Sequence, residues 1–277
     1  MKFIPSIYTT DNKPITLVAS YTTSKSGVKT FVIPISIAQS TLSMYETPNY
    51  VLKLSAYGKT NSSEDAKTWV DTVHNINTTF TNSISFDDNL GWYNNGFRVS
   101  GIGNYATINY NPLAGNPSKG ITIEFEFQTE KVNNTNDVIM MFGDATGGHI
   151  SITPNSATIY DSSNNDILHT NFKSNERLKL AFIINNSSTS DESDLIYIVN
   201  NGILERAINA KGIIFTNNTG KITIGNSESG IILYNIRVYN RAISYTDAYN
   251  NYVYDSENKS TIIANNDVLL NGEINFD

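Results

Sequence analysis

The chain has 277 residues, a formal net charge of −7 and no cysteine, and 16% of its residues are charged. The absence of cysteine excludes disulfide scaffolds, cysteine nucleophiles and thiolate metal sites, and the acidic balance lacks the basic footprint of nucleic-acid-binding proteins. Tyr (16) and Phe (12) are abundant beside many β-branched residues, a mixture that favours β-strands.

The first 50 residues predict three short strands, at 3–8, 15–21 and 30–37. Pro34 removes a backbone donor from the third strand, which places that strand at a sheet edge or a bulge. The N-terminus lacks the long apolar core of a secretory signal, and no run of 18 apolar residues predicts a membrane-spanning helix. Because three strands are marginally stable alone, we expect residues 1–49 to form a small β appendage or part of a domain.

Short alternating segments between polar turns then continue through residue 255, a pattern typical of an all-β sandwich. Asn201-Gly202 predicts a type I′ hairpin turn, and an irregular alternation at Tyr234 and Asn235 predicts a β-bulge. The predicted strands are 51–57, 79–86, 96–100, 105–110, 121–128, 138–142, 149–153, 157–160, 177–184, 195–200, 203–208, 221–224 and 231–239.

The strand at 121–128 (ITIEFEFQ) has the clearest alternation in the chain. Its Ile and Phe residues share one face, and its other face carries Thr122, Glu124, Glu126 and Gln128. We expect this polar face to contact solvent, and we expect Arg237 in the last strand to point to solvent or to the rim.

One short helix is predicted after the last strand. Ser244 can cap it, and Asp247 can reach back to the cap in a shorter-armed version of the capping box. The helical pattern continues to Tyr252. Residues 256–277 are predicted to form a linker that leads into a tail strand.

Several segments resemble a known family. GWYNNGFRVSG (91–101) and GITIEFEFQTE (120–130) are similar to the opening strands of laminin-G-like, concanavalin A-like domains, and GIILYNIRVYNRAISYTDAYNNY (230–252) is similar to their closing strand and short helix. The resemblance covers residues 50–255. It implies an all-β, two-sheet antiparallel jelly-roll sandwich, to which the N-terminal appendage and one short C-terminal helix are added. The Asn- and Lys-rich style resembles modules of bacteriophage tail and virion structural proteins.

The family includes both lectins and glycan-cleaving enzymes, so the polar residues must distinguish them. Its retaining glycanases carry a Glu-x-Asp-x-x-Glu motif, whose carboxylates lie about 5–5.5 Å apart. The nearest match, Glu124, Glu126 and Glu130, has the wrong middle acid and the wrong last spacing. We therefore expect no enzyme activity, and a glycoside hydrolase is the second alternative.

Two other patterns predict no site. Residues 101–106 match G-x-G-x-x-A, but a strand follows where dinucleotide binding needs a helix, so the glycines predict a turn. The histidines, His74, His149 and His169, are too far apart in the sequence to predict a zinc site.

Sugar binding requires aromatic faces beside planar amides or carboxylates. Two loops combine these groups: Trp92, Tyr93, Asn94 and Asn95 in the first, and Tyr160, Asp161 and Asn164 in the second. The alternative is that Trp92 packs in the core or at the rim and that the tyrosines contact other proteins.

The resemblance also implies calcium, which family members often bind in rim loops through Asp, Asn and backbone carbonyl oxygens. The candidate ligands are Asp144, Asp161 and Asp166. The alternative is that these side chains form Asx-turns with their own loops. No other cofactor is expected.

The residues and the resemblance together predict a non-catalytic adhesion or structural module that binds carbohydrate. Its expected partners are cell-surface glycan or other virion subunits, in a phage tail, a virion or an extracellular surface assembly. The first alternative is a purely structural or oligomerisation domain of a virion. Neither nucleic acid nor membrane insertion is expected.

Overall fold

The chain divides into two compact units, Met1–Met44 with Glu257–Asp277 and Tyr45–Ser256. Within the first unit, β1 (Ile15–Thr23) and β2 (Gly27–Ile35) pair as an antiparallel hairpin. The strands predicted at 3–8 and in the C-terminal tail lie outside the described residues, and the predicted domain boundaries stay a prediction. This computed structural model describes residues 15–23, 27–35, 46–114, 119–187, 195–209 and 220–264.

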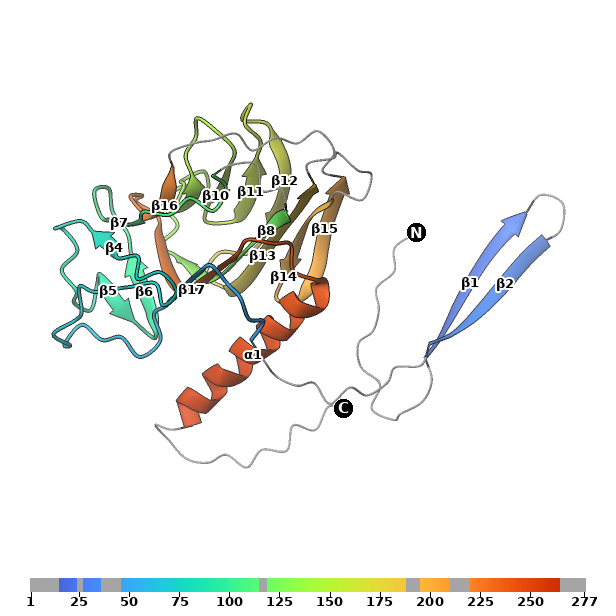
Figure 1. Cartoon of the computed structure of the whole chain (residues 1–277), viewed down its shortest axis with the longest axis horizontal. Coiled ribbons are helices and arrows are strands. Elements are labelled where there is room, and N and C mark those ends of the chain that lie inside the picture. Colours follow the sequence, from blue (N-terminus) through green and yellow to red (C-terminus); the bar gives the residue numbers. More distant parts are fainter. Residues whose placement is uncertain are drawn as a thin grey trace. The chain divides into compact units, whose positions relative to one another are not determined.

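The second unit is a β-sandwich of two antiparallel sheets (Figure 1). The seven-stranded sheet has the order β12 (Asp166–Asn171), β11 (Ser156–Tyr160), β10 (His149–Ile152), β9 (Met140–Gly143), β16 (Lys221–Gly225), β7 (Tyr105–Ile108) and β4 (Thr78–Phe80). The eight-stranded sheet has the order β15 (Ile203–Asn209), β14 (Leu195–Asn200), β13 (Arg177–Ser187), β8 (Lys119–Glu130), β17 (Gly230–Tyr239), β6 (Gly96–Val99) and β5 (Gly91–Tyr93), with β3 (Leu52–Ser55) also paired to β17. The predicted all-β, two-sheet antiparallel architecture is confirmed.

The core between the sheets follows from the period-two alternation of the strands. Phe125 of β8 is fully buried, and its ring centroid lies 5.9 Å from that of Phe182 on β13 and 5.2 Å from that of Phe142 on β9. Because Phe142 belongs to the seven-stranded sheet, the last contact joins the two layers. Burial of each such ring contributes about 1.5–3 kcal/mol of transfer free energy.

A second aromatic group closes the other end of the sandwich. Phe80 of β4 and Phe97 of β6 lie 5.2 Å apart between their centroids, so they also join the two sheets. Trp92 packs edge-on against Trp69 at 5.3 Å. Aromatic contacts of this kind add roughly 0.5–1.5 kcal/mol each beyond the area that they bury.

Two local irregularities predicted from the sequence are confirmed. Asn201 and Gly202 have φ angles of 47° and 77° in the β14–β15 turn, as a type I′ turn requires. The pairing of β17 with β8 shifts register between Leu233 and Asn235, which places a bulge there.

Two strands were not predicted. β5 has three residues, too few to show an alternation, and β12 begins with the polar Asp166 and is interrupted by His169. Both strands lie at the ends of their sheets, where one neighbour is enough to complete the pairing.

The helix α1 (Tyr245–Ala264) begins as predicted. The backbone N–H of Asp247 donates to Ser244 Oγ at 3.1 Å, and the backbone N–H of Ser244 donates to Asp247 Oδ2 at 3.2 Å. The helix continues beyond Tyr252 because residues 253–264 include no glycine or proline. No helix in the described part of the chain is both long and apolar enough to cross a bilayer.

The first turns of α1 cover the outer face of the eight-stranded sheet. Ala248 packs with Ala181 and Ile183 of β13 and with Tyr239 of β17 in a small apolar cluster separate from the main core. Tyr245 Oη donates to the backbone oxygen of Gly202 at 2.8 Å, which ties the helix to the β14–β15 turn.

The prediction that the polar face of β8 contacts solvent is wrong. Glu124 and Glu126 are 0% and 1% exposed, and Arg237, predicted to point outward, is 3% exposed. Residues of α1 contact Glu124 and Arg237, Glu46 before β3 also contacts Arg237, and Tyr57 after β3 contacts Glu126. The physical reason is that each charge on this face has an opposite charge beside it, so the face can be buried.

Candidate functional site

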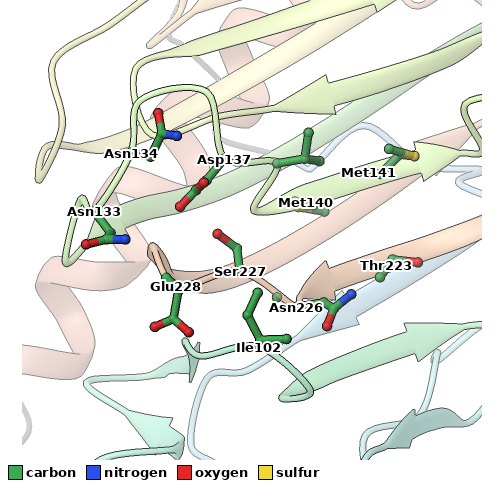
Figure 2. Close-up of a pocket in the computed structure, with 12 residues that line it drawn as sticks. Ile102, Asn133, Asn134, Asp137, Met140, Met141, Thr223, Asn226, Ser227 and Glu228 are labelled. Carbon is green, nitrogen blue, oxygen red and sulfur yellow. The ribbon is translucent and has the colours of Figure 1, made fainter.

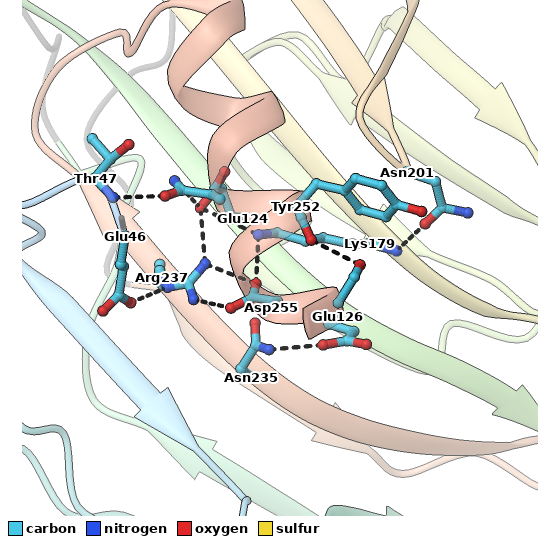
Figure 3. Close-up of polar contacts among 12 residues, drawn as sticks. Glu46, Thr47, Glu124, Glu126, Lys179, Asn201, Asn235, Arg237, Tyr252 and Asp255 are labelled. Carbon is cyan, nitrogen blue, oxygen red and sulfur yellow. Dashed lines mark hydrogen bonds and ion pairs between the residues drawn. The ribbon is translucent and has the colours of Figure 1, made fainter. Parts of the chain in front are cut away.

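Four carboxylates and four cations gather on the outer face of the eight-stranded sheet, and we call this cluster the ionic layer. Figure 3 shows Glu124, Lys179 and Arg237 beside Asp255 of α1. Its charges balance, which lowers the cost of removing them from water. The members are Glu46, Glu124, Glu126, Asp255, Lys53, Arg177, Lys179 and Arg237.

Arg237 is the centre of the ionic layer. Its guanidinium contacts Asp255 through both Nη atoms and Glu46 through Nε at 2.5 Å, and its Nη1 lies 3.4 Å from Glu124 Oε2. Lys179 Nζ donates to Asp255 Oδ2 at 2.6 Å. Burial alone would raise the pKa of Asp255, but the charges of Lys179 and Arg237 outweigh burial and hold that pKa below its usual value.

Glu126 organises the other half of the ionic layer. Its carboxylate accepts from Arg177 Nε at 2.7 Å, from Asn235 Nδ2 at 2.9 Å and from Tyr57 Oη at 3.2 Å. Burial, followed by the charge of Glu126, raises the pKa of the Tyr57 phenol far above its usual value, so Tyr57 stays protonated and can donate. The Glu126 carboxylate is therefore neutralised and closed to a substrate.

An open pocket lies elsewhere, on the seven-stranded sheet. A pocket of about 450 Å³ forms where the β6–β7 turn, the β8–β9 loop and the β16–β17 turn meet (Figure 2). We call it the loop pocket. Met141 of β9 and Thr223 of β16, which are register partners, lie along its floor. Its volume is within the roughly 300–1,000 Å³ of ligand-binding pockets.

Hydrogen bonds between the three loops hold the loop pocket in shape. Ser229 Oγ donates to Asp137 Oδ2 at 2.7 Å, and the backbone N–H of Asn133 donates to Ser229 Oγ at 2.9 Å. On the opposite side, the backbone N–H of Gly103 donates to Asn226 Oδ1 at 3.0 Å. The predicted glycine turn is confirmed there, since Gly101 and Gly103 both have positive φ.

The loop pocket combines polar and apolar groups. Figure 2 shows Asp137 and Ser227 pointing toward each other, with Ile102 on the facing turn. Asn133 and Glu228 also line it, and Ile102 is 68% exposed. Carboxylates and amides can bind hydroxyl groups in fixed directions, while Ile102 and Met141 can contact the apolar face of a sugar ring.

The first predicted sugar loop does not expose its tryptophan. Trp92 is 5% exposed, and its indole N–H donates to the backbone oxygen of Ala66 at 2.6 Å. Tyr93 is partly exposed, with the Arg98 guanidinium 4.5 Å from its ring centroid. Asn94 and Asn95 both have positive φ and form the β5–β6 turn.

The second predicted sugar loop is the β11–β12 turn. The Tyr160 ring stacks on His149 at 4.5 Å between centroids, and Asn164 has a positive φ. Asp161 Oδ1 accepts from the backbone N–H groups of Ser163 and Asn165, at 2.8 and 2.9 Å. Neither predicted loop contributes to the loop pocket.

The three predicted calcium ligands are each engaged locally. Asp144 accepts from the backbone N–H of Thr146 at 2.9 Å, Asp161 closes its own turn, and Asp166 pairs with His169 at 3.0 Å. Within the described ranges, no group of three or more His, Cys, Asp or Glu side chains is arranged to hold a metal ion.

The residues of the loop pocket were not predicted from the sequence. They come from three loops that are far apart in the chain, and none carries an aromatic residue that marks a sugar site. The ionic layer had a usable signal, because Glu124 and Glu126 alternate on one strand while Lys179 and Arg237 hold outward positions on two others.

Comparison with known proteins places the fold. The binding domain of botulinum neurotoxin serotype D matches with a TM-score of 0.56 and 16% identity over 76% of this chain and 51% of that one. The receptor-binding domain of botulinum neurotoxin type G matches with a TM-score of 0.53 and 15% identity over 75% and 52%. A serotype D ligand binding domain in complex with N-acetylneuraminic acid has a TM-score of 0.56 at 15% identity, over 76% and 51%.

These likenesses establish a shared β-sandwich fold. The chain spans about half the length of the solved structures that it matches. No protein-family model matches the sequence, and no curated protein matches it.

Proposed function

We propose that this chain is a non-catalytic carbohydrate-binding module that presents a glycan site on the loops of a β-sandwich. The loop pocket carries the proposal, because it is open, has the volume of a ligand site and combines hydroxyl-binding side chains with exposed apolar ones. The solved structures with the same fold support a binding role, since their names describe receptor-binding domains and one holds a sugar.

A glycoside hydrolase is less well supported. Glu124 and Glu126, the nearest match to a catalytic pair, are buried and paired with Arg237 and Arg177. A general acid or a nucleophile must reach the scissile bond, and the ionic layer leaves these carboxylates no access to one.

The proposal extends to the setting of the module. We propose that it is a laminin-G-like, concanavalin A-like domain of a phage tail, a virion or another extracellular surface assembly, with glycan or neighbouring subunits as partners. The segment 230–252, which forms β17 and the start of α1, supports the family through its closing-strand pattern. Mass spectrometry of purified particles tests this setting, and absence of the chain from them would remove it.

Substitution of Thr223 by phenylalanine tests the site itself. The larger side chain should fill the floor of the loop pocket while it keeps a strand-favouring residue in β16. Glycans that bind the wild type on an array should bind Thr223→Phe at least about tenfold more weakly in calorimetry. Thr79→Phe is the matched control, because Thr79 is exposed and lies two strands away on the same sheet, at β4.

Two results would contradict the proposal. If the wild type binds no glycan at millimolar concentration, the carbohydrate role is wrong. If Thr223→Phe and Thr79→Phe bind glycan as the wild type does, the site lies outside the loop pocket.

A structural or oligomerisation role is the second candidate, and one observation favours it. Ile203 and Leu204 on β15, and Leu195 on β14, are 62%, 49% and 41% exposed. Exposed apolar residues on the last strands of a sheet are typical of contacts between subunits. Light scattering of the wild type and Ile203→Lys tests this role, and a concentration-independent monomer would exclude self-association.

A further inference from the structure

The charged groups of the loop pocket all have one sign. Asp137 and Glu228 line it, and no Lys, Arg or His is present among the described residues of its lining. Asp137 comes from the β8–β9 loop and Glu228 from the β16–β17 turn, so the two carboxylates approach the pocket from different loops. A ligand in the pocket therefore meets negative charge from two directions.

Hydrogen bonding favours the charged form of Asp137. The hydrogen bond from Ser229 Oγ to Asp137 Oδ2 holds the pKa of Asp137 below its usual value, so it is ionised near neutral pH. Glu228 is exposed to solvent. An ionised carboxylate only accepts hydrogen bonds, which suits the O–H groups of a sugar and excludes another carboxylate.

The remaining lining adds groups that a neutral sugar needs. The side-chain oxygen of Asn226 accepts a hydrogen bond from the backbone N–H of Gly103. This bond also fixes the direction of the Asn226 amide NH₂ group. Ile102 and Met141 supply apolar contact. Sugar hydroxyls can donate to the carboxylates and accept from an amide, so an uncharged polyol matches the lining without an unpaired buried charge.

We propose that the loop pocket selects an uncharged, hydroxyl-rich sugar and disfavours sugars that carry a carboxylate, such as sialic acid or a uronate. This inference rests on the proposed function and names the ligand class of the same site. N-acetylneuraminic acid belongs to a neurotoxin ligand binding domain that this chain matches over about half of that chain's length. Repulsion from two nearby carboxylates should lower the affinity of the pocket for an anionic sugar by roughly tenfold or more relative to the neutral counterpart.

A matched pair of oligosaccharides, identical except for a terminal sialic acid, tests the inference by calorimetry in low salt. EDTA is included so that a bridging cation cannot join two carboxylates. The wild type should bind the neutral member at least about tenfold more tightly. Glu228→Gln removes one charge and should therefore bring the affinities for the neutral and sialylated members closer together. Glu176→Gln changes an exposed carboxylate outside the pocket and should leave the ratio of the two affinities unchanged.

The outcomes separate this inference from the proposed function. If the sialylated member binds as tightly or more tightly, and Thr223→Phe abolishes that binding, the charge selection is wrong while the carbohydrate role stands. If the ratio is the same in Glu228→Gln as in the wild type, the carboxylates do not select the ligand. If neither member nor any array glycan binds, the proposed function falls and takes this inference with it.

Discussion

At the scale of single residues, Asp255 shows how the ionic layer depends on complete pairing. One carboxylate receives hydrogen bonds from Lys179 and from Arg237, and all three side chains are buried. A buried pair is often no more stable than an apolar substitute, but removal of one member leaves the others charged and without compensation. Removal of Asp255 should therefore destabilise the folded protein by more than the energy of its own contacts.

We predict that Asp255→Ala lowers the free energy of unfolding by about 3–5 kcal/mol, because it removes the carboxylate that Lys179 and Arg237 share and leaves both buried cations incompletely paired. Chemical denaturation measures the change. Glu176→Ala is the control: its side chain is exposed and lies 3.7 Å from the equally exposed Lys173, so its loss should change stability by less than about 0.5 kcal/mol. Equal effects of the two substitutions would mean that the ionic layer contributes no more than a surface pair.

The same carboxylate predicts a dependence of stability on pH. The pKa of Asp255 is held below the 3.8 of an ordinary aspartate, so the unfolded chain takes up a proton at higher pH than the folded one. The stabilisation is complete above about pH 3.8 and is lost as the pH falls below that value. We expect the difference in unfolding free energy between wild type and Asp255→Asn to shrink over this acid range. A difference that is constant from pH 6 to pH 2.5 would show that Asp255 does not titrate as predicted.

At the scale of elements, the β14–β15 turn serves both as a hairpin and as a seat for α1. Gly202 adopts a φ of 77°, and a Cβ atom placed there would lie 2.8 Å from Tyr252 Cδ1 and 3.0 Å from Tyr249 Cδ2. Two separate constraints therefore require glycine: the turn conformation and the close approach of two helical tyrosines.

We predict that Gly202→Ala destabilises the fold by about 2–3 kcal/mol, of which about 1 kcal/mol comes from the backbone and the rest from the contact with the helix. Gly58→Ala is the matched control, since Gly58 has a φ of 76° and no atom within 4 Å of a Cβ placed there. It should cost about 1 kcal/mol alone. Thermal unfolding of both variants measures the difference, and similar losses would mean that α1 does not press on the turn.

The local sequence pattern was enough to predict strands and the faces that their side chains share. The alternation of 121–128 correctly predicted the strand and its inward Phe residues. It failed for the outward residues because their burial depends on α1 and on Glu46, which lie about 80–130 positions away along the chain. Period two identifies which side chains share a face, but it carries no information on what later covers that face.

At the scale of the whole sandwich unit, the two polar sites are built on different sheets. The ionic layer lies on the outer face of the eight-stranded sheet, and the loop pocket rests on β9 and β16 of the seven-stranded one. The two-sheet architecture was predictable from strand number and turn spacing. The loop pocket was not, because the meeting of three distant loops is set by topology and leaves no motif in any one of them.

Arg237 also joins the two ends of the sandwich unit. It bonds Glu46, the second residue of the Tyr45–Ser256 unit, and Asp255, the last residue but one. Tension applied at these two residues would load Arg237 together with Lys53 and Lys179, which bond the same carboxylates. If the module is anchored by its ends while its loops bind a surface, a pulling force would act first on these ionic contacts. The loops that bind the ligand would keep their geometry until the contacts broke.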